Sequence, residues 1–380
     1  MSRFPENNKL DRESYLHLPF SHSLQYKYVG KNKRGLSATE QIFMIDGKDV
    51  PYHHHPQSMH GTATRKARPR VQLTEEHAER MQLPIIDETS SDVTKVVFPS
   101  GRVNYVLLAR RNSKYPILRD LHKYMDEHAP HLDEFVSKLD KRSYLKDDLG
   151  GGRYVASGFG NMGKNVPATV RPPNQPALRQ CLKYAEHQSL AKIVGGIFSQ
   201  IAKCIAKFCG GVYEENQKLM KQNPNLAWPP LDFQNSEWKW MSSQFIVRRW
   251  GPALAEPKWT LDKVIVAAHT DRGDLDSTMF ICYTTGGGKR GKGGPVAGTD
   301  LAVFEHAAGG AGFRVKTCIE DTVVVVVLNS NRQVHGCIKN EASFAEDSSA
   351  WTTRIVPYVP IGVYHWMIRH PDGFPFTDIP

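Results

Sequence analysis

The spacing of apolar positions changes along the chain. Over residues 116–139 and again over 176–209, apolar side chains recur with the period of an amphipathic helix. From Trp238 onward, short apolar runs are separated by turn residues instead, which is typical of β-strands. The sequence therefore predicts helices followed by a strand-rich part, which is the organisation of an α+β protein.

Two long helices are predicted in the first part. A helical pattern covers residues 116–139, and we expect a break at Pro130 because proline has no amide hydrogen to donate. A continuous apolar stripe predicts a second helix over 176–209. The pair Gly210–Gly211 follows this helix and can end it with a left-handed cap. Helices of this kind commonly pack against one sheet of a barrel, and we expect that role here.

The strand candidates of the second part follow one another closely. Many short strands at such spacing are typical of an all-β barrel or jelly roll. We therefore expect a β-barrel core with the N-terminal helices packed outside it. Residues 94–109 predict two further short strands. The strands predicted in the second part are 243–250, 264–268, 278–283, 301–305, 313–318, 322–328 and 352–359.

The chain has 380 residues, which allows one large domain or two ordinary ones. Residues 1–80 are polar and predict an irregular basic N-terminal segment. We expect residues 81–235 to form a helical support region and residues 236–380 to form the strand-rich barrel core.

The composition bounds the class of protein. The chain carries 49 lysines and arginines against 39 acidic residues, a net charge of +10. A basic surplus of this size favours an acidic partner such as nucleic acid, although a soluble protein that happens to be basic is the alternative. No apolar run is long enough for a transmembrane helix, and the polar N-terminus does not resemble a secretory signal. We expect an intracellular protein without a membrane partner.

The six cysteines give no metal-binding signature. None forms a Cys-x-x-Cys pair, and no cluster of Cys and His has the spacing of a zinc site. Most are expected to be reduced, buried thiols of an intracellular protein.

A histidine and a carboxylate lie two residues apart after an apolar run. His269 and Asp271 follow residues 264–268, and side chains at i and i+2 of an extended segment point the same way. His335 follows the very apolar run 322–328. Two imidazoles and one carboxylate on one face of Fe(II) leave positions open for oxygen and a reducing co-substrate. We therefore predict a facial triad of His269, Asp271 and His335.

Two alternatives to this triad stay open. His306 directly follows the predicted strand 301–305 and is a rival ligand. His335 would then be an ordinary structural histidine.

One arginine suggests an anionic co-substrate. Arg354 lies on the otherwise uncharged strand 351–358, and a buried guanidinium without a partner would be costly. A dicarboxylate such as 2-oxoglutarate can chelate iron at its keto-acid end and pair with arginine at the other. The alternatives are a surface role for Arg354 on an edge strand, and Arg332 as the anchoring cation.

The order His269-x-Asp271, His335 and then Arg354 resembles the Fe(II)/2-oxoglutarate dioxygenase superfamily over about the last 140 residues. The helical support region, intracellular character and basic charge resemble the TET/JBP branch of that superfamily. The resemblance implies a double-stranded β-helix (jelly-roll) core buttressed by N-terminal helices. It also implies Fe(II) and 2-oxoglutarate as cofactors, and oxidation of the methyl group of 5-methylcytosine or thymine in DNA. Such a base must be flipped out of the duplex, and a nuclear location follows from that substrate.

The chain departs from this branch in the long gap between Asp271 and His335. The gap holds a glycine-rich stretch with Lys289, Arg290 and Lys292, which can follow a phosphate backbone or be a disordered loop without that role. One algal subgroup of the branch uses ascorbate and attaches a glyceryl group to 5-methylcytosine, and the same ligands would serve it. A further hypothesis is an oxygenase acting on a small molecule or a protein side chain. A non-catalytic nucleic-acid-binding module is a third, which the intact triad disfavours.

Overall fold

The computed structural model describes a large part of the chain, and the statements below concern that part. It covers 73–138, 185–224, 309–339 and 351–359 without interruption. The shorter described segments are 15–17, 24–28, 40–45, 48–53, 153–158, 227–228, 237–242, 244–250, 271, 275, 278–285, 299–306 and 361–369.

The largest element is an eight-stranded sheet, called here the large sheet. Its strand order is β1-β7-β8-β16-β13-β18-β12-β9. Neighbouring strands are antiparallel except β1 and β7, which are parallel. Its strands are β1 (Tyr15–His17), β7 (Val93–Val97), β8 (Val103–Arg110), β9 (Arg153–Gly158), β12 (Gln244–Trp250), β13 (Thr278–Thr285), β16 (Thr322–Leu328) and β18 (Trp351–Tyr358).

A second sheet of five strands, called here the small sheet, has the order β5-β17-β14-β15-β6. Its central strands are antiparallel, and the short outer strands β5 and β6 run parallel to their neighbours. Its strands are β5 (Leu73–Thr74), β6 (Ile85–Ile86), β14 (Thr299–His306), β15 (Gly309–Val315) and β17 (His335–Lys339).

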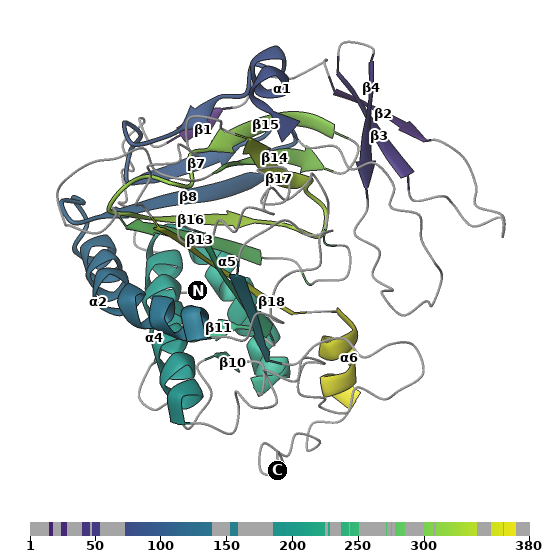
Figure 1. Ribbon diagram of the computed structural model, residues 1–380. Helices are drawn as coiled ribbons and strands as arrows, with labels where there is room; N and C mark the ends of the chain where they lie inside the picture. Colours follow the sequence, from purple (N-terminus) through teal and green to yellow (C-terminus); the bar gives the residue numbers. More distant parts are fainter. Residues whose placement is uncertain are drawn as a thin grey trace, which may run out of the picture.

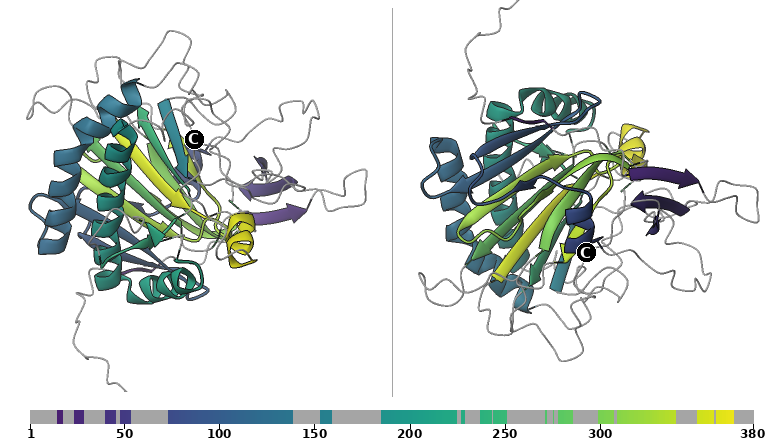
Figure 2. Two further views of the ribbon diagram at one scale, coloured as in Figure 1. Left: turned by 90° about the horizontal axis from the view of Figure 1, so that it is seen from below. Right: turned by 90° about the horizontal axis from the view of Figure 1, so that it is seen from above.

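Strand β16 lies at the centre of three layers. All seven of its residues are buried, which fits a continuous apolar run covered on both faces. Val323 and Val325 belong to the core formed with the helices, whereas Val324 and Val326 belong to the core formed with the small sheet. The order of layers is therefore helices, large sheet and small sheet (Figures 1 and 2).

The helical layer consists mainly of α2 (Pro116–Lys138) and α4 (Ala185–Phe208), which pack against each other and against the large sheet. Figure 2 shows both helices on the same face of that sheet. Helix α5 (Gly210–Gln222) extends this layer. Helix α1 (Glu75–Arg80) packs against the small sheet, and α6 (Ile361–Arg369) contacts the end of α5 through Tyr364. The protein is thus an α+β fold, as the periodicity predicts.

Two details of the predicted helices are wrong. Helix α2 continues through Pro130 without a break, because its burial against the sheet and α4 outweighs the hydrogen bond that proline cannot donate. Gly210 and Gly211 do not form a left-handed cap. They begin α5, and Gly101 is the one glycine with a positive φ among the described residues.

The three-part division of the sequence does not follow the sheets. Strand β1 from residues 1–80 and strands β7 and β8 from residues 81–235 all join the large sheet. Residues 1–80 also contain β2 (Leu24–Tyr28), β3 (Glu40–Ile45) and β4 (Lys48–His53), which form an antiparallel three-stranded sheet. The segment expected to be irregular therefore holds strands, and the described strands of the large sheet come from all three parts.

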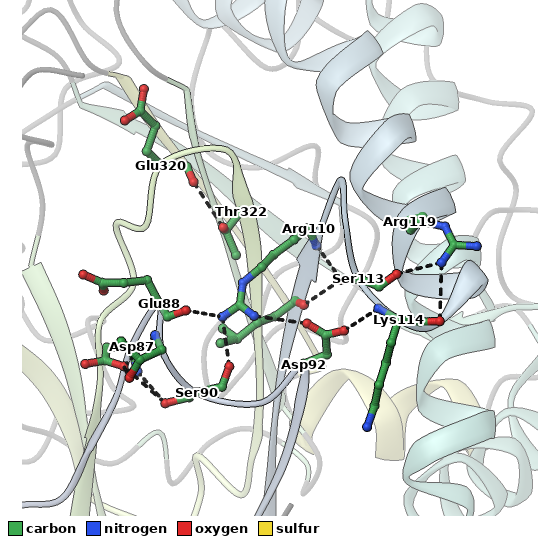
Figure 3. A network of polar contacts seen from close by, with 12 residues as sticks. Asp87, Glu88, Ser90, Asp92, Arg110, Ser113, Lys114, Arg119, Glu320 and Thr322 are labelled. Atoms are coloured by element: carbon green, nitrogen blue, oxygen red, sulfur yellow. Dashed lines mark hydrogen bonds and ion pairs between the residues drawn. The ribbon is translucent and has the colours of Figure 1, made fainter. Parts of the chain in front are cut away.

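Arg110 fixes the start of α2 to the end of β8 (Figure 3). Its guanidinium pairs with Asp92 at 3.1 Å and donates hydrogen bonds to the carbonyls of Glu88 and Ser90. The other carboxylate oxygen of Asp92 accepts the Lys114 amide at 2.8 Å. This network closes the connection between sheet and helix at the end of β16 where Thr322 lies.

The remaining strands are β10 (Ala227–Trp228) and β11 (Trp240–Met241), which pair with each other. Within the described part of the chain, none of the helices combines the length and the apolar character needed to span a membrane.

Candidate metal centre

Two of the three predicted iron ligands lie side by side. His335 Nε2 is 3.3 Å from Asp271 Oδ2, although the two residues are far apart in the sequence. The side chain of His335 is 13% exposed and that of Asp271 is 27% exposed, so both are partly accessible to solvent. The third predicted ligand, His269, lies outside the described residues.

The connection between β16 and β17 brings these two residues together. The amide of Asp271 donates a hydrogen bond to the carbonyl of Ser330 at 2.8 Å. His335 is the first residue of β17 and pairs with Val303 in the small sheet. The prediction placed His335 after the strand 322–328 but did not identify β17, because His-Gly-Cys-Ile-Lys shows no strand pattern.

The other ring nitrogen of His335 fixes its tautomer. Nδ1 lies 3.1 Å from the carbonyl oxygen of Gln333. A carbonyl can only accept, so Nδ1 carries the hydrogen and donates it. In the neutral ring, Nε2 then keeps its lone pair, and this is the atom that faces Asp271. Such an arrangement orients a histidine as a metal ligand.

Arg354 is buried between the two sheets. It belongs to β18 of the large sheet and is 3% exposed. Its Nη2 donates to Thr317 Oγ1 at 3.1 Å, and its Nη1 lies 3.4 Å from Cys337 Sγ. Cys318 Sγ is 4.0 Å from Nη2. Thr317, Cys337 and Cys318 thus surround the guanidinium between the two sheets.

Cys337 relates the position of Arg354 to that of His335. Both His335 and Cys337 lie on β17, two residues apart, so their side chains project from the same face. This separation corresponds to about 7 Å along a strand. The guanidinium that contacts Cys337 therefore lies one step further along β17 than the imidazole.

The donor set fits a divalent iron ion. Imidazole nitrogen and carboxylate oxygen are the ligands of non-haem iron sites, and a buried guanidinium nearby fits an anionic group. Within the part of the chain that the structure describes, no group of three His, Cys, Asp or Glu side chains is placed to hold a metal ion. The described residues supply two ligands, and His269 lies outside them.

The rival candidates are placed less favourably or lie outside the description. Arg332 is exposed in the connection before β17, whereas Arg354 is buried. His306 ends β14, three residues beyond the partner of His335, and its side chain is outside the described set. The predicted nucleic-acid contacts also lie outside the described residues: Lys289, Arg290 and Lys292.

A second buried ionisable group lies in the small sheet. Asp300 on β14 is 5% exposed, and burial raises its pKa to about 7. Arg314, whose Nη1 is 3.8 Å from Asp300 Oδ2, acts in the opposite direction. Arg314 also pairs with Glu75 at the start of α1. No motif in the sequence identifies this carboxyl group.

Sequence reasoning missed the polar residues that surround the predicted site. Thr317 contacts Arg354, and Gln333 contacts His335 through its carbonyl. Asn104 on β8 donates a hydrogen bond to the side chain of Gln333. The position of Gln333 two residues before His335 is the only local signal of these, because Thr317 and Asn104 belong to distant segments.

Comparisons with known proteins do not assign a family. No protein-family model matches the chain. No curated protein matches it either. Among solved structures, one similar chain is a BsmA homologue from Methylobium petroleophilum PM1, with 14% sequence identity. The similarity covers 67% of this chain and 87% of that one with a TM-score of 0.28, which is too low to support a conclusion about fold or function.

Proposed function

We propose that the protein is an Fe(II)-dependent dioxygenase whose iron is held by His269, Asp271 and His335. The observation that carries this proposal is the 3.3 Å approach of His335 Nε2 to Asp271 Oδ2. The tautomer set by the Gln333 carbonyl supports it further, because Nε2 keeps its lone pair on the side of Asp271.

The finer fold that we propose is a double-stranded β-helix, or jelly roll, buttressed by helices. Two observations support it. The large and small sheets share one apolar core, which includes Val324 and Phe313. The proposed ligand His335 lies in the small sheet and the proposed anion-binding Arg354 in the large sheet, so a ligand between the sheets could contact both.

We propose 2-oxoglutarate as the co-substrate, with its distal carboxylate at Arg354. The guanidinium is buried, and Thr317 and Cys337 hold it at a fixed place between the sheets, within reach of a ligand bound beside His335. Bound iron and 2-oxoglutarate would together supply oxygen activation and the oxidation of a C–H bond. Arg354 would orient the co-substrate, Thr317 would hold the guanidinium plane, and the surrounding apolar core would exclude water.

We propose DNA as the substrate, with the methyl group of 5-methylcytosine or thymine as the target. The net charge of +10 supports a polyanionic partner. Lys289, Arg290 and Lys292 are the proposed phosphate contacts, and a flipped base would present its methyl group to the iron. This substrate implies a nuclear protein.

Two alternatives remain as candidate functions. Ascorbate, which is also an anion, could occupy the place proposed for 2-oxoglutarate, and the protein would then attach a glyceryl group to 5-methylcytosine. The other alternative is oxidation of a small molecule or protein side chain, which requires no affinity for DNA.

Anaerobic titration tests the iron and the co-substrate together. Fe(II) with 2-oxoglutarate should give a weak visible charge-transfer band, whereas Fe(II) with ascorbate should not. Absence of the band, together with no succinate formed in air, would contradict the 2-oxoglutarate proposal. Incubation with methylated DNA and mass spectrometry of the nucleosides then tests the substrate. Unchanged 5-methylcytosine and thymine, with succinate still produced, would favour a substrate other than DNA.

A further inference from the structure

The connection between β16 and β17 contacts both proposed ligands. This connection, residues 329–334, is called here the ligand loop. The carbonyl of Ser330 accepts the Asp271 amide at 2.8 Å, and the carbonyl of Gln333 accepts the His335 Nδ1 hydrogen at 3.1 Å. The backbone conformation of this one loop therefore sets the positions of Asp271 and His335 together.

The side chain of Gln333 holds the ligand loop closed from inside. Gln333 is fully buried, and its Oε1 accepts the amide of Asn329 at 2.8 Å. The backbone amide of Gln333 donates in return to the Asn329 carbonyl at 2.8 Å. These two hydrogen bonds join the first residue of the loop to its fifth and restrict the backbone between them.

Asn104 anchors this closed loop to the large sheet. Its Nδ2 donates to Gln333 Oε1 at 3.1 Å, and the side chain is 2% exposed. Asn104 lies on β8, which pairs with β16 along most of its length. The anchor therefore stands on a strand that is paired on both sides, with β7 and with β16, and it reaches the loop that immediately follows β16.

Stability alone is a poor explanation for this buried amide pair. Burying two amides costs desolvation energy, and the net gain from their hydrogen bond is small. Apolar side chains of similar shape would fill the same space without desolvating two amides, and the only hydrogen bond to the backbone lost among those described would be that of the Asn329 amide. What an amide pair adds is a fixed direction, because the acceptor Gln333 Oε1 must face Asn104 Nδ2 and the Asn329 amide simultaneously.

We infer that Asn104 and Gln333 are positioning residues that bring Asp271 and His335 into the arrangement that binds metal. This inference rests on the proposed metal site and adds two residues to it, neither of which touches the metal itself. They act through the ligand loop, by holding the Ser330 and Gln333 carbonyls in place.

Metal binding in shape-matched variants tests the inference. Gln333→Met and Asn104→Leu keep the approximate volume and remove the amide. Mn²⁺ is the probe, and its affinity is measured by calorimetry and its coordination by electron paramagnetic resonance. Both variants should bind Mn²⁺ roughly 10- to 100-fold more weakly than the wild type, with a changed resonance at saturation. Two separate variants are used so that one failure to fold does not prevent the test.

Asn216 provides a matched control. It is also fully buried, and its Oδ1 accepts one backbone amide, that of Met241, at 3.0 Å. Like Gln333, it has an amide nitrogen without a hydrogen-bond partner among the described residues. Asn216 lies between α5 and β11, outside the proposed site. Asn216→Leu should lower the thermal stability to a similar extent and leave the Mn²⁺ affinity within about twofold of the wild type.

The possible results distinguish the positioning role of Asn104 and Gln333 from the metal site itself. Weaker Mn²⁺ binding in Gln333→Met and Asn104→Leu, but not in Asn216→Leu, supports the positioning role. Wild-type affinity in both site variants, or an equal loss in the control, overturns it and leaves the metal site standing. A wild-type protein that binds no Mn²⁺ overturns the metal site, and the positioning role with it.

Discussion

Arg354 of the large sheet donates a hydrogen bond at 3.1 Å to Thr317, which lies two residues beyond the end of β15 in the small sheet. The bond crosses the apolar core between the sheets and lies among residues that are almost completely buried. A positive charge is therefore held at a fixed place between the sheets, one step along β17 from His335.

Replacement of this arginine should weaken the binding of 2-oxoglutarate without loss of the metal. Lysine keeps the charge but lacks the planar fork that pairs with a carboxylate. For Arg354→Lys we expect roughly 10- to 100-fold weaker binding, measured from the charge-transfer band of the Fe(II) protein. Thr317→Val should cause a smaller loss, roughly fivefold. Arg332→Lys is the control, because Arg332 is exposed; an equal effect there would contradict the assignment of Arg354.

Removal of the proposed carboxylate ligand should abolish metal binding and turnover. Asp271→Ala deletes one of the two described ligands. Even the loss of a residue that only hydrogen-bonds to a ligand typically lowers the metal affinity roughly 10- to 100-fold. We expect a still larger loss of Mn²⁺ affinity, with little change in the melting temperature because Asp271 is partly exposed. Glu79→Ala on α1, at an exposed position, should bind Mn²⁺ normally. Turnover retained by Asp271→Ala would remove this residue from the site.

The buried carboxyl group of Asp300 should make stability depend on pH. Burial raises its pKa from 3.8 to about 7, so the folded protein holds this proton more tightly than the unfolded chain does. Its contribution to the free energy of unfolding is therefore greatest below pH 3.8. The contribution decreases as the pH rises from 3.8 to about 7, and it stays constant at higher pH. Each unit between the two pKa values corresponds to about 1.4 kcal/mol, so the change should be a few kcal/mol.

Asp300→Asn isolates this contribution, because asparagine resembles the protonated acid at every pH. Urea denaturation of both proteins at several values between pH 5 and pH 8 measures it. The variant should gain stability relative to the wild type as the pH rises. Parallel curves for the two proteins would show that Asp300 ionises at its ordinary pKa.

Close contact between α2 and α4 depends on the absence of a side chain at Gly196. A Cβ atom there would lie 1.9 Å from the hydroxyl oxygen of Tyr124. Gly196→Ala should therefore destabilise the protein by about 1–3 kcal/mol, the usual cost of overpacking. In a Tyr124→Leu background the same change should instead stabilise, because alanine is the better helix former. A double-mutant cycle by chemical denaturation measures this reversal, and additive effects would contradict it.

The elements that were predicted are those whose local pattern agrees with their final environment. Strand β16 is apolar at almost every position and is buried on both faces, and the stripe over 185–208 forms α4. Strand β17 was missed because its five residues have no alternation, and its place depends on pairing with β14. The break at Pro130 was wrong because tertiary packing, which local propensity does not contain, keeps α2 continuous.

The proposed site likewise contains residues that the sequence predicts and residues that it does not. The approach of Asp271 to His335 was predicted because each follows an apolar run, and strand ends commonly meet at one edge of a barrel. Asn104 and Gln333 were not predicted, because a buried amide pair has no local signature. In the sequence each is an ordinary polar residue, and their hydrogen bond exists only because the fold brings these distant positions together.

The pairing of β8 with β16 has a consequence for the boundaries of the catalytic unit. Residues 236–380 contain the proposed ligands but omit the strand that borders β16. In a fragment with these limits, the apolar β16 would be an exposed edge strand. Its unpaired backbone groups could then form hydrogen bonds with a strand of another chain. Truncated chains whose limits are chosen from the ligand motif, and not from the strand order of the sheet, are therefore expected to aggregate. The smallest unit that keeps β16 covered on this side begins upstream of β8.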